Sequence, residues 1–186
     1  ANWGILRPGQ FTLYTIIGFL DVAVRSGVMA FSGFMLIENG IREDAVGGFL
    51  ALTFLGGAFG KLLCGMPIQK LGSKRIVLIT EMLMILGCYL LPSISGGWAL
   101  ALFLPIFGFM LNGTSSVIYI GLAPTFEPGR RSRGYALYYT LNFFSTAVSP
   151  YFLGLVGDAY SLDILFYAAG VVMLIGLPLA IFLKDV

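Results

Sequence analysis

Charged residues are scarce in this chain: Asp, Glu, Lys and Arg make up only 11% of its 186 residues. A soluble domain carries roughly 25% charged residues, because its outer surface faces water. This chain is instead 58% hydrophobic, with a mean hydropathy of +0.92, so most of its surface must face lipid. We therefore predict a multi-pass integral membrane protein, with the lipid bilayer around it and no nucleic acid among its partners.

Histidine is absent, and the only cysteines, Cys64 and Cys88, lie in apolar segments without the spacing of metal ligands. Histidine is the commonest metal ligand and general base, so its absence argues against a metalloenzyme. We interpret the cysteines as packing residues. No Ser/Lys or paired-Asp arrangement indicates an intramembrane enzyme either. The sequence thus predicts no catalytic residue, no metal and no cofactor.

No low-complexity stretch divides the chain, so we predict one domain over residues 1–186. It has no signal-peptide pattern, and it begins with Ala rather than Met, which favours a trimmed chain or a piece of a longer protein. A transmembrane helix needs about 20 mostly apolar residues. Such segments lie at about residues 11–37, 45–66, 76–91, 98–123, 135–156 and 164–183. The predicted fold class is an all-α membrane protein with six transmembrane helices.

Basic residues gather in alternate loops. If the N-terminus is cytoplasmic, the inner segments contain Arg7, Lys70, Lys74, Arg75, Arg130, Arg131, Arg133 and Lys184. The outer loops contain Arg42 and the acidic residues Glu38, Glu43, Asp44, Asp158 and Asp163. An excess of Lys and Arg in short cytoplasmic loops is the pattern described by the positive-inside rule. We therefore expect both termini in the cytoplasm, with the protein in the cell (inner) membrane.

Four charged residues lie inside the predicted spans, where each costs about 2.5–3.5 kcal/mol unless it has a partner or faces water. Asp21 and Arg25 are four residues apart on the first helix, so they share a face. Lys61 and Glu81 lie on two antiparallel helices at matching depth, which predicts a contact between them. Two structural alternatives remain open: Lys61 extending to the interface, and Asp21 and Arg25 serving only to hold helices together.

Neutral polar residues accompany these charges. Asn112 lies only a few residues deeper than Lys61 and Glu81, and Thr114, Ser115 and Ser116 continue its polar patch. On the fifth helix a polar stripe recurs at spacings of three or four residues: Tyr135, Tyr138, Asn142, Ser145 and Ser149. Such a stripe is equally compatible with a cavity lining and with a polar seam between helices. Gly56 and Gly60 on the second helix predict close helix packing.

The loop between the second and third helices contains a motif in the order Gly65, Gln69, Lys70, Gly72, Lys74, Arg75. It resembles the loop signature of the major facilitator superfamily, with Gln69 in place of the family's Asp and Ser73 in place of a basic residue. These departures are typical of the family's second half. The stretches 56–61, 111–116 and 149–154 also resemble that half, namely the family's eighth, tenth and eleventh helices.

The resemblance implies half of a twelve-helix transporter, built from 3+3 inverted repeats. In that family the first, second, fourth and fifth helices of the half face a central cavity. The substrate or proton-coupling candidates are therefore Asp21, Arg25, Lys61, Glu81, Asn112, Tyr138 and Asn142, with Glu81 orienting Lys61. The motif residues form the candidate gating loop. Burial favours a neutral carboxyl and a nearby cation favours a charged one, so we hypothesise that Asp21 is the coupling carboxylate.

We thus expect a secondary active transporter that moves a small organic solute by alternating access, with proton-coupled export by an antiporter as the favoured form. Its partners would be a small-molecule substrate and the other six-helix half, which is fused, separate or a second copy. A six-helix channel or facilitator is one alternative, although no filter motif or paired re-entrant helix is evident. A non-transporting membrane subunit is another.

Overall fold

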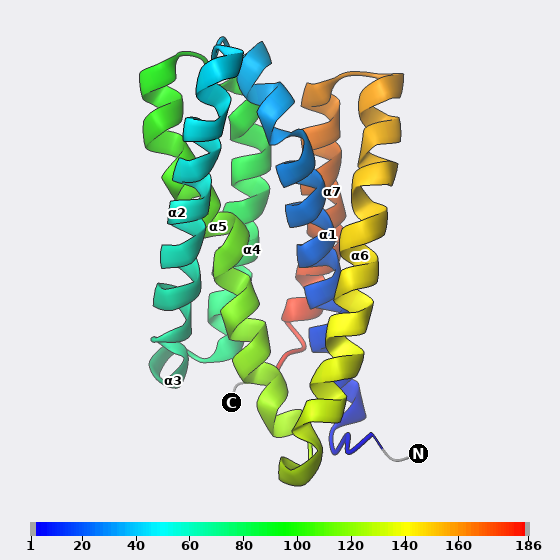
Figure 1. Cartoon of the computed structure of the whole chain (residues 1–186). Coiled ribbons are helices and arrows are strands. Elements are labelled where there is room, and N and C mark those ends of the chain that lie inside the picture. The colour runs from blue at the N-terminus through cyan, green and yellow to red at the C-terminus, as the bar shows by residue number, and fades with distance from the viewer. Residues whose placement is uncertain (1–2, 185–186) are drawn as a thin grey trace.

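The computed structural model of the protein describes residues 3–184, except for the side chain of Gln69. Within these residues the long helices are α1 (Pro8–Glu38), α2 (Val46–Gly65), α4 (Ser73–Leu90), α5 (Gly97–Leu122), α6 (Arg131–Ala159) and α7 (Leu162–Ala180). A one-turn helix, α3 (Ile68–Leu71), lies in the loop between α2 and α4. Figure 1 shows the long helices running side by side as a bundle. The all-α prediction is therefore confirmed.

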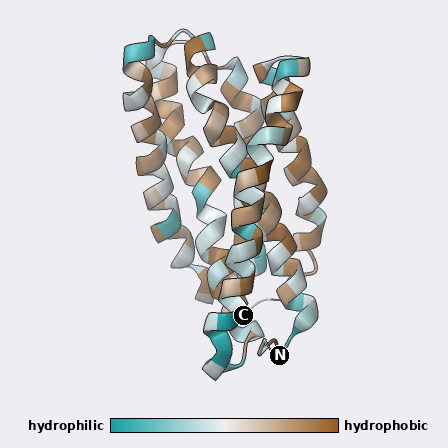
Figure 2. Ribbon diagram, turned by 45° about the vertical axis from the view of Figure 1, so that its right-hand side comes forward, coloured by the Kyte–Doolittle hydropathy of each residue, from teal (hydrophilic) through white to brown (hydrophobic). Residues whose placement is uncertain are grey.

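Five helices in the described part of the chain are long and apolar enough to cross a membrane. The exception, α6, has 29 residues but carries the polar stripe found in the sequence. It nevertheless packs along α1 and α7 over the length of the bundle (Figure 1). Figure 2 shows hydrophobic residues along the helices, with hydrophilic residues gathered mainly at the ends of the bundle. Large apolar side chains such as Phe54, Phe143 and Ile175 are exposed on the surface, as lipid contact requires.

The helix packing has an internal two-fold pattern. α1 packs against α6 as α5 packs against α2, and α1 packs against α7 as α5 packs against α4. α4 and α7 pack against each other. Exchanging α1 with α5, α2 with α6 and α4 with α7 leaves all these pairings in place. This is the arrangement that inverted repeats of three helices produce.

Glycine permits the closest of these contacts, between α2 and α5. A Cβ atom on Gly56 would collide with the backbone carbonyl of Pro105, and one on Gly108 would collide with the carbonyl of Thr53. A Cβ on Gly60 would lie 2.6 Å from the carbonyl oxygen of Phe109. The small-residue spacing on the second helix therefore brings two backbones together, as predicted.

The bundle has two apolar cores separated by a polar layer. One core includes Phe107, Met84 and Val28, and the other includes Tyr14, Val77 and Ile118. Along α1, α4 and α5 the residues between the two cores are polar and buried, and we call them the polar layer: Asp21, Thr80, Glu81 and Thr114. Two of these four residues, Asp21 and Glu81, are carboxylic acids, and buried carboxylic acids in a membrane protein are candidates for a functional role.

The described ends of the chain meet the α5–α6 loop or each other at one end of the bundle (Figure 1). The amide of Glu127 donates to the carbonyl of Gly4 at 2.8 Å, and Ile5 forms an isolated bridge with Phe126. Gln10, near the start of α1, accepts a hydrogen bond from the amide of Lys184 at 2.9 Å. The α2–α4 loop lies at this end too, so the basic segments found in the sequence are on one side.

Candidate functional site

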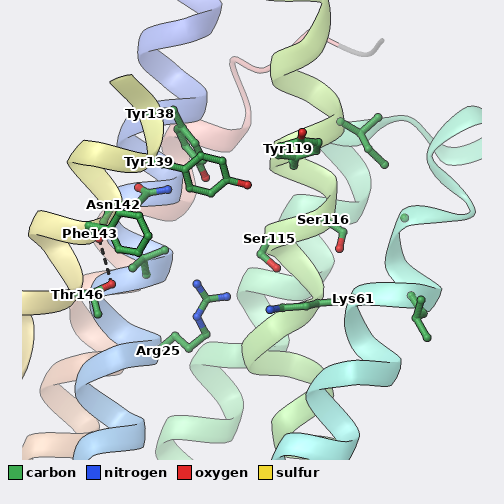
Figure 3. A pocket seen from close by; sticks show the side chains of 14 residues that line it. Arg25, Lys61, Ser115, Ser116, Tyr119, Tyr138, Tyr139, Asn142, Phe143 and Thr146 are labelled. Atoms are coloured by element: carbon green, nitrogen blue, oxygen red, sulfur yellow. Dashed lines mark hydrogen bonds between the residues drawn. The ribbon is translucent and has the colours of Figure 1, made fainter. Parts of the chain in front are cut away.

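A groove of about 590 Å³ opens between α1, α2, α5 and α6. Figure 3 shows side chains from these helices turned towards it. Its lining comprises Val22, Arg25, Lys61, Leu62, Gly65, Ser115, Ser116, Tyr119, Ile120, Tyr138, Tyr139, Asn142, Phe143 and Thr146. The lining residues come from the first, second, fourth and fifth long helices, which are the helices that the family resemblance placed around a cavity. Of the predicted candidates, the groove brings together Arg25, Lys61, Tyr138, Asn142 and Gly65.

Arg25 and Lys61 face each other across the groove. They come from α1 and α2, and Figure 3 shows the two cationic groups pointing towards one another. The side chain of Arg25 is 21% exposed, and Lys61 is exposed. Two positive charges repel each other at short range, so Arg25 and Lys61 in this arrangement favour an anion between them.

Asp21 lies one helical turn before Arg25 on α1 and is not part of the groove lining. Its side chain is 1% exposed, and its Oδ2 atom is 3.9 Å from Nη1 of Arg25. The predicted pairing of these residues is confirmed. The contact is longer than a hydrogen bond, and neither carboxyl oxygen of Asp21 has a hydrogen-bond partner among the described residues. The charge of Lys61 also acts on Asp21.

Glu81 does not contact Lys61, so the predicted pair is wrong. Glu81 is fully buried on α4. The groups that act on its carboxyl are the charges of Asp21 and Arg25 and the hydroxyl of Thr114. The physical reason is the helix arrangement: α5 packs against both α2 and α4, so helices that are consecutive in sequence are not the main neighbours in space. Glu81 belongs to the polar layer and cannot orient Lys61.

Asn112 was expected to face the cavity, but it lies outside the groove lining. Its amide nitrogen donates to the carbonyl of Gly108 on its own helix at 3.1 Å, and its side chain packs against Gly57. It therefore belongs to the α2–α5 seam. Thr114 turns the other way and donates to Oγ1 of Thr80 at 2.7 Å in the polar layer. Of that polar patch, only Ser115 and Ser116 line the groove.

The polar stripe on α6 is partly a cavity lining and partly a polar seam between helices, the two alternatives that the sequence left open. Tyr138 and Asn142 line the groove, and Oδ1 of Asn142 has no hydrogen-bond partner among the described residues. Further along the helix, Ser145 donates to the carbonyl of Phe19, and Ser149 donates to that of Ala23. These two hydroxyls form a seam with α1. One stripe is thus a groove lining over its first half and a helix contact over its second.

Three aromatic residues of the groove were missed by the sequence analysis: Tyr119, Tyr139 and Phe143. Tyr119 stacks on Tyr135 with ring centroids 4.4 Å apart and lies 6.3 Å from the ring of Tyr139. The ring centroid of Tyr139 is in turn 6.4 Å from that of Phe143. A signal was present in the sequence, since Tyr119 lies four residues after Ser115 and thus on the same helical face. In an apolar chain, however, aromatic residues are too common for that spacing to stand out.

The candidate gating loop is separate from most of the groove. Gly65 lines the groove, whereas Lys70 and Arg75 are exposed at the end of the bundle. Gly72 has φ of +78°, a conformation that favours glycine, and it allows α4 to begin directly after α3. Lys74 is half-buried in the first turn of α4, and the side chain of Gln69 lies outside the described part of the chain.

Ser73, which takes the place of a basic residue in the motif, is fully buried. Its hydroxyl is 2.7 Å from the hydroxyl of Tyr14 on α1. This hydrogen bond ties the start of α4 to α1, so the loop is anchored to the same helix that carries Asp21 and Arg25. The departure from the family pattern therefore has a structural role here.

A sequence model of the Major Facilitator Superfamily matches residues 14–186. The chain belongs to this superfamily. Two solved structures of a peptide transporter, POT, in complex with sulfate are also similar to it. The TM-score is 0.73 for a mutant of that transporter and 0.69 for the second structure. No curated protein sequence matches the chain.

Each POT structure is 21% identical to the chain, so the likeness concerns the fold alone. The match covers 93% of this chain but 37% of the transporter. The major facilitator chain described here therefore spans well under half the length of those proteins. Membership of this superfamily points to a transporter rather than an enzyme.

Proposed function

We propose that this major facilitator chain is half of a secondary active transporter that moves a small organic solute by alternating access. One observation carries the proposal: Arg25, in the lining of a groove formed by α1, α2, α5 and α6, contacts a buried carboxyl group, Asp21, that has no hydrogen-bond partner among the described residues. A six-helix half encloses the groove on one side only. The other half, whether fused, separate or a second copy, would complete it and rock against this half.

Asp21 is the proposed proton-coupling group. It is buried, its hydrogen-bonding capacity is unused among the described residues, and its nearest cation, Arg25, borders the groove. A proton on Asp21 would weaken its attraction to Arg25, and a charged Asp21 would hold Arg25 back from a solute. The charge of this carboxyl is thereby linked to the occupancy of the groove. Export is the direction that the sequence resemblance suggests.

The test uses the complete protein in proteoliposomes with labelled organic acids, amines and short peptides. For a transporter, unlabelled solute on the far side should accelerate uptake of its labelled form, whereas a channel gives no such stimulation. With Asp21→Asn, this exchange should persist while uphill accumulation driven by a pH gradient is lost. A pH gradient also reports direction, because an exporter that exchanges solute for protons moves the solute towards the acidic side.

The matched control is Asp158→Asn, which removes an exposed carboxyl from the far end of α6. It should leave both exchange and accumulation unchanged. Proton-driven accumulation that survives in Asp21→Asn would remove Asp21 from the coupling mechanism. Absence of trans-stimulation with every solute class would count against transport itself.

A further inference from the structure

The groove carries charge of one sign. Among its lining residues, Arg25 and Lys61 are charged and both are basic, and none is Asp or Glu. The rest of the polar lining consists of hydroxyl groups and the amide of Asn142. Cations at membrane depth are costly unless a partner or water compensates them. The lining is positively charged, so a negatively charged solute would compensate it best.

Neither cation is fully neutralised by the chain itself. Nη1 of Arg25 has no hydrogen-bond partner among the described residues, and its contact with Asp21 is 3.9 Å long. Lys61 forms no ion pair within residues 3–184, although the charge of Asp21 acts on it across the helices. Charge-assisted hydrogen bonds from Arg or Lys to a carboxylate or phosphate are short and strong. Both donors are thus available for an anionic group placed between them.

The rest of the groove suits an organic body rather than an inorganic ion. Tyr119, Tyr139 and Phe143 present aromatic rings to the same groove as the two cations (Figure 3). A volume of about 590 Å³ falls within the usual range for small-molecule sites. Ser115 and Ser116 lie between Tyr119 and Lys61 (Figure 3). The hydroxyl of Ser115 donates to the carbonyl of Asn112 at 2.8 Å, so Ser116 is the serine that can donate to an acidic group.

We propose that the groove binds a small organic anion, with its carboxylate or phosphate held between Arg25 and Lys61 and its apolar part against the aromatic residues. This inference rests on the proposed function, because it assigns a substrate class to the same groove. It also gives Arg25 two alternative partners, Asp21 within the protein and the anion in the groove.

The test uses three probes of one shape and different charge: 2-naphthoate, 2-naphthamide and 2-naphthamidine. Their binding to the purified complete protein in neutral detergent is measured by calorimetry, with empty micelles as the blank. The anion should bind at least about tenfold more tightly than the neutral amide, as one charge-assisted hydrogen bond predicts. The cationic amidine should show no binding.

Lys61→Gln should weaken 2-naphthoate binding about tenfold and leave 2-naphthamide binding unchanged. The side chain of Lys61 is exposed, so this change should leave the fold intact. Arg25→Lys provides a second variant, which keeps the charge but loses the paired donors. The matched control, Lys184→Gln, removes an exposed lysine at the end of the bundle and should bind 2-naphthoate as the parent does.

Equal binding of the three probes would overturn the proposal, as would undiminished 2-naphthoate binding in Lys61→Gln. An anionic lipid headgroup offers the same chemistry, so phosphatidylglycerol is added to the micelles as a separate arm. Displacement of 2-naphthoate by that lipid would assign the groove to lipid and reject a free solute. The outcomes separate this inference from the proposed function. If the protein exchanges only amines, transport is retained and the anion site is rejected. If the protein binds the anion but exchanges no solute, the anion site is retained and transport is rejected.

Discussion

At the scale of the residue, the polar layer is the most unusual environment in the molecule. Two carboxyl groups, Asp21 and Glu81, lie there with less than 2% of either side chain exposed, and the charges of Asp21 and Arg25 both act on Glu81. Only Arg25 is within ion-pair distance of either acid among the described residues. Removing one partner of a buried ion pair is costly, because the other charge is left without compensation.

Arg25→Gln should therefore destabilise the protein by up to about 3 kcal/mol, because Asp21 loses its cation. The double variant Arg25→Gln with Asp21→Asn should recover most of that loss, since no uncompensated charge remains. Thermal unfolding in detergent measures both. If the double variant is no more stable than Arg25→Gln alone, the pair does not contribute to stability through its charges.

At the scale of the element, backbone contact between α2 and α5 decides how the groove is shaped. Gly56, Gly60 and Gly108 remove side chains where the two helices meet, so Lys61 on α2 and Ser115 on α5 reach the same groove. α1 and α6 meet differently, through hydroxyl groups of Ser145 and Ser149 on carbonyls of α1. The first contact brings two backbones together at glycines, and the second is made by serine hydroxyls.

Gly56→Ala should destabilise the bundle by about 1–3 kcal/mol, because its Cβ atom would collide with the carbonyl of Pro105 and force the two backbones apart. Gly48→Ala is the matched control on the same helix, with nothing within 4 Å of its added Cβ atom. It should be neutral or slightly stabilising, since Ala favours a helix over Gly. Unfolding temperatures that are equal for the two variants would contradict this account of the seam.

At the scale of the whole molecule, the basic segments lie at one end of the bundle, and the positive-inside rule predicts that this end is cytoplasmic. Cys64 and Cys88 are buried, so an added cysteine can report on its own side. Ser132→Cys lies at the basic end and Ser95→Cys at the opposite end, and both positions are exposed.

A membrane-impermeant thiol reagent should label Ser95→Cys in intact cells and Ser132→Cys only in inside-out vesicles. Both variants replace one exposed hydroxyl by a thiol, so each serves as the control for the other. Labelling of Ser132→Cys in intact cells would reverse the predicted orientation.

The sequence by itself determined the membrane class, the helical spans and the Asp21–Arg25 pair. The hydropathy of each span depends only on the residues within that span. A spacing of four residues places two side chains on one helical face whatever packs around the helix. The superfamily resemblance of the α2–α4 loop rests on local residues in the same way.

Only the tertiary structure decided which helices are neighbours. Because α5 packs against both α2 and α4, Lys61 faces the groove while Glu81 lies in the polar layer, and Asn112 turns into the α2–α5 seam. The same packing divides the α6 stripe between Tyr138 and Asn142 in the groove and the serines that bind α1. Depth along a helix follows from counting residues, but the direction of a side chain towards another helix depends on contacts far apart in the chain.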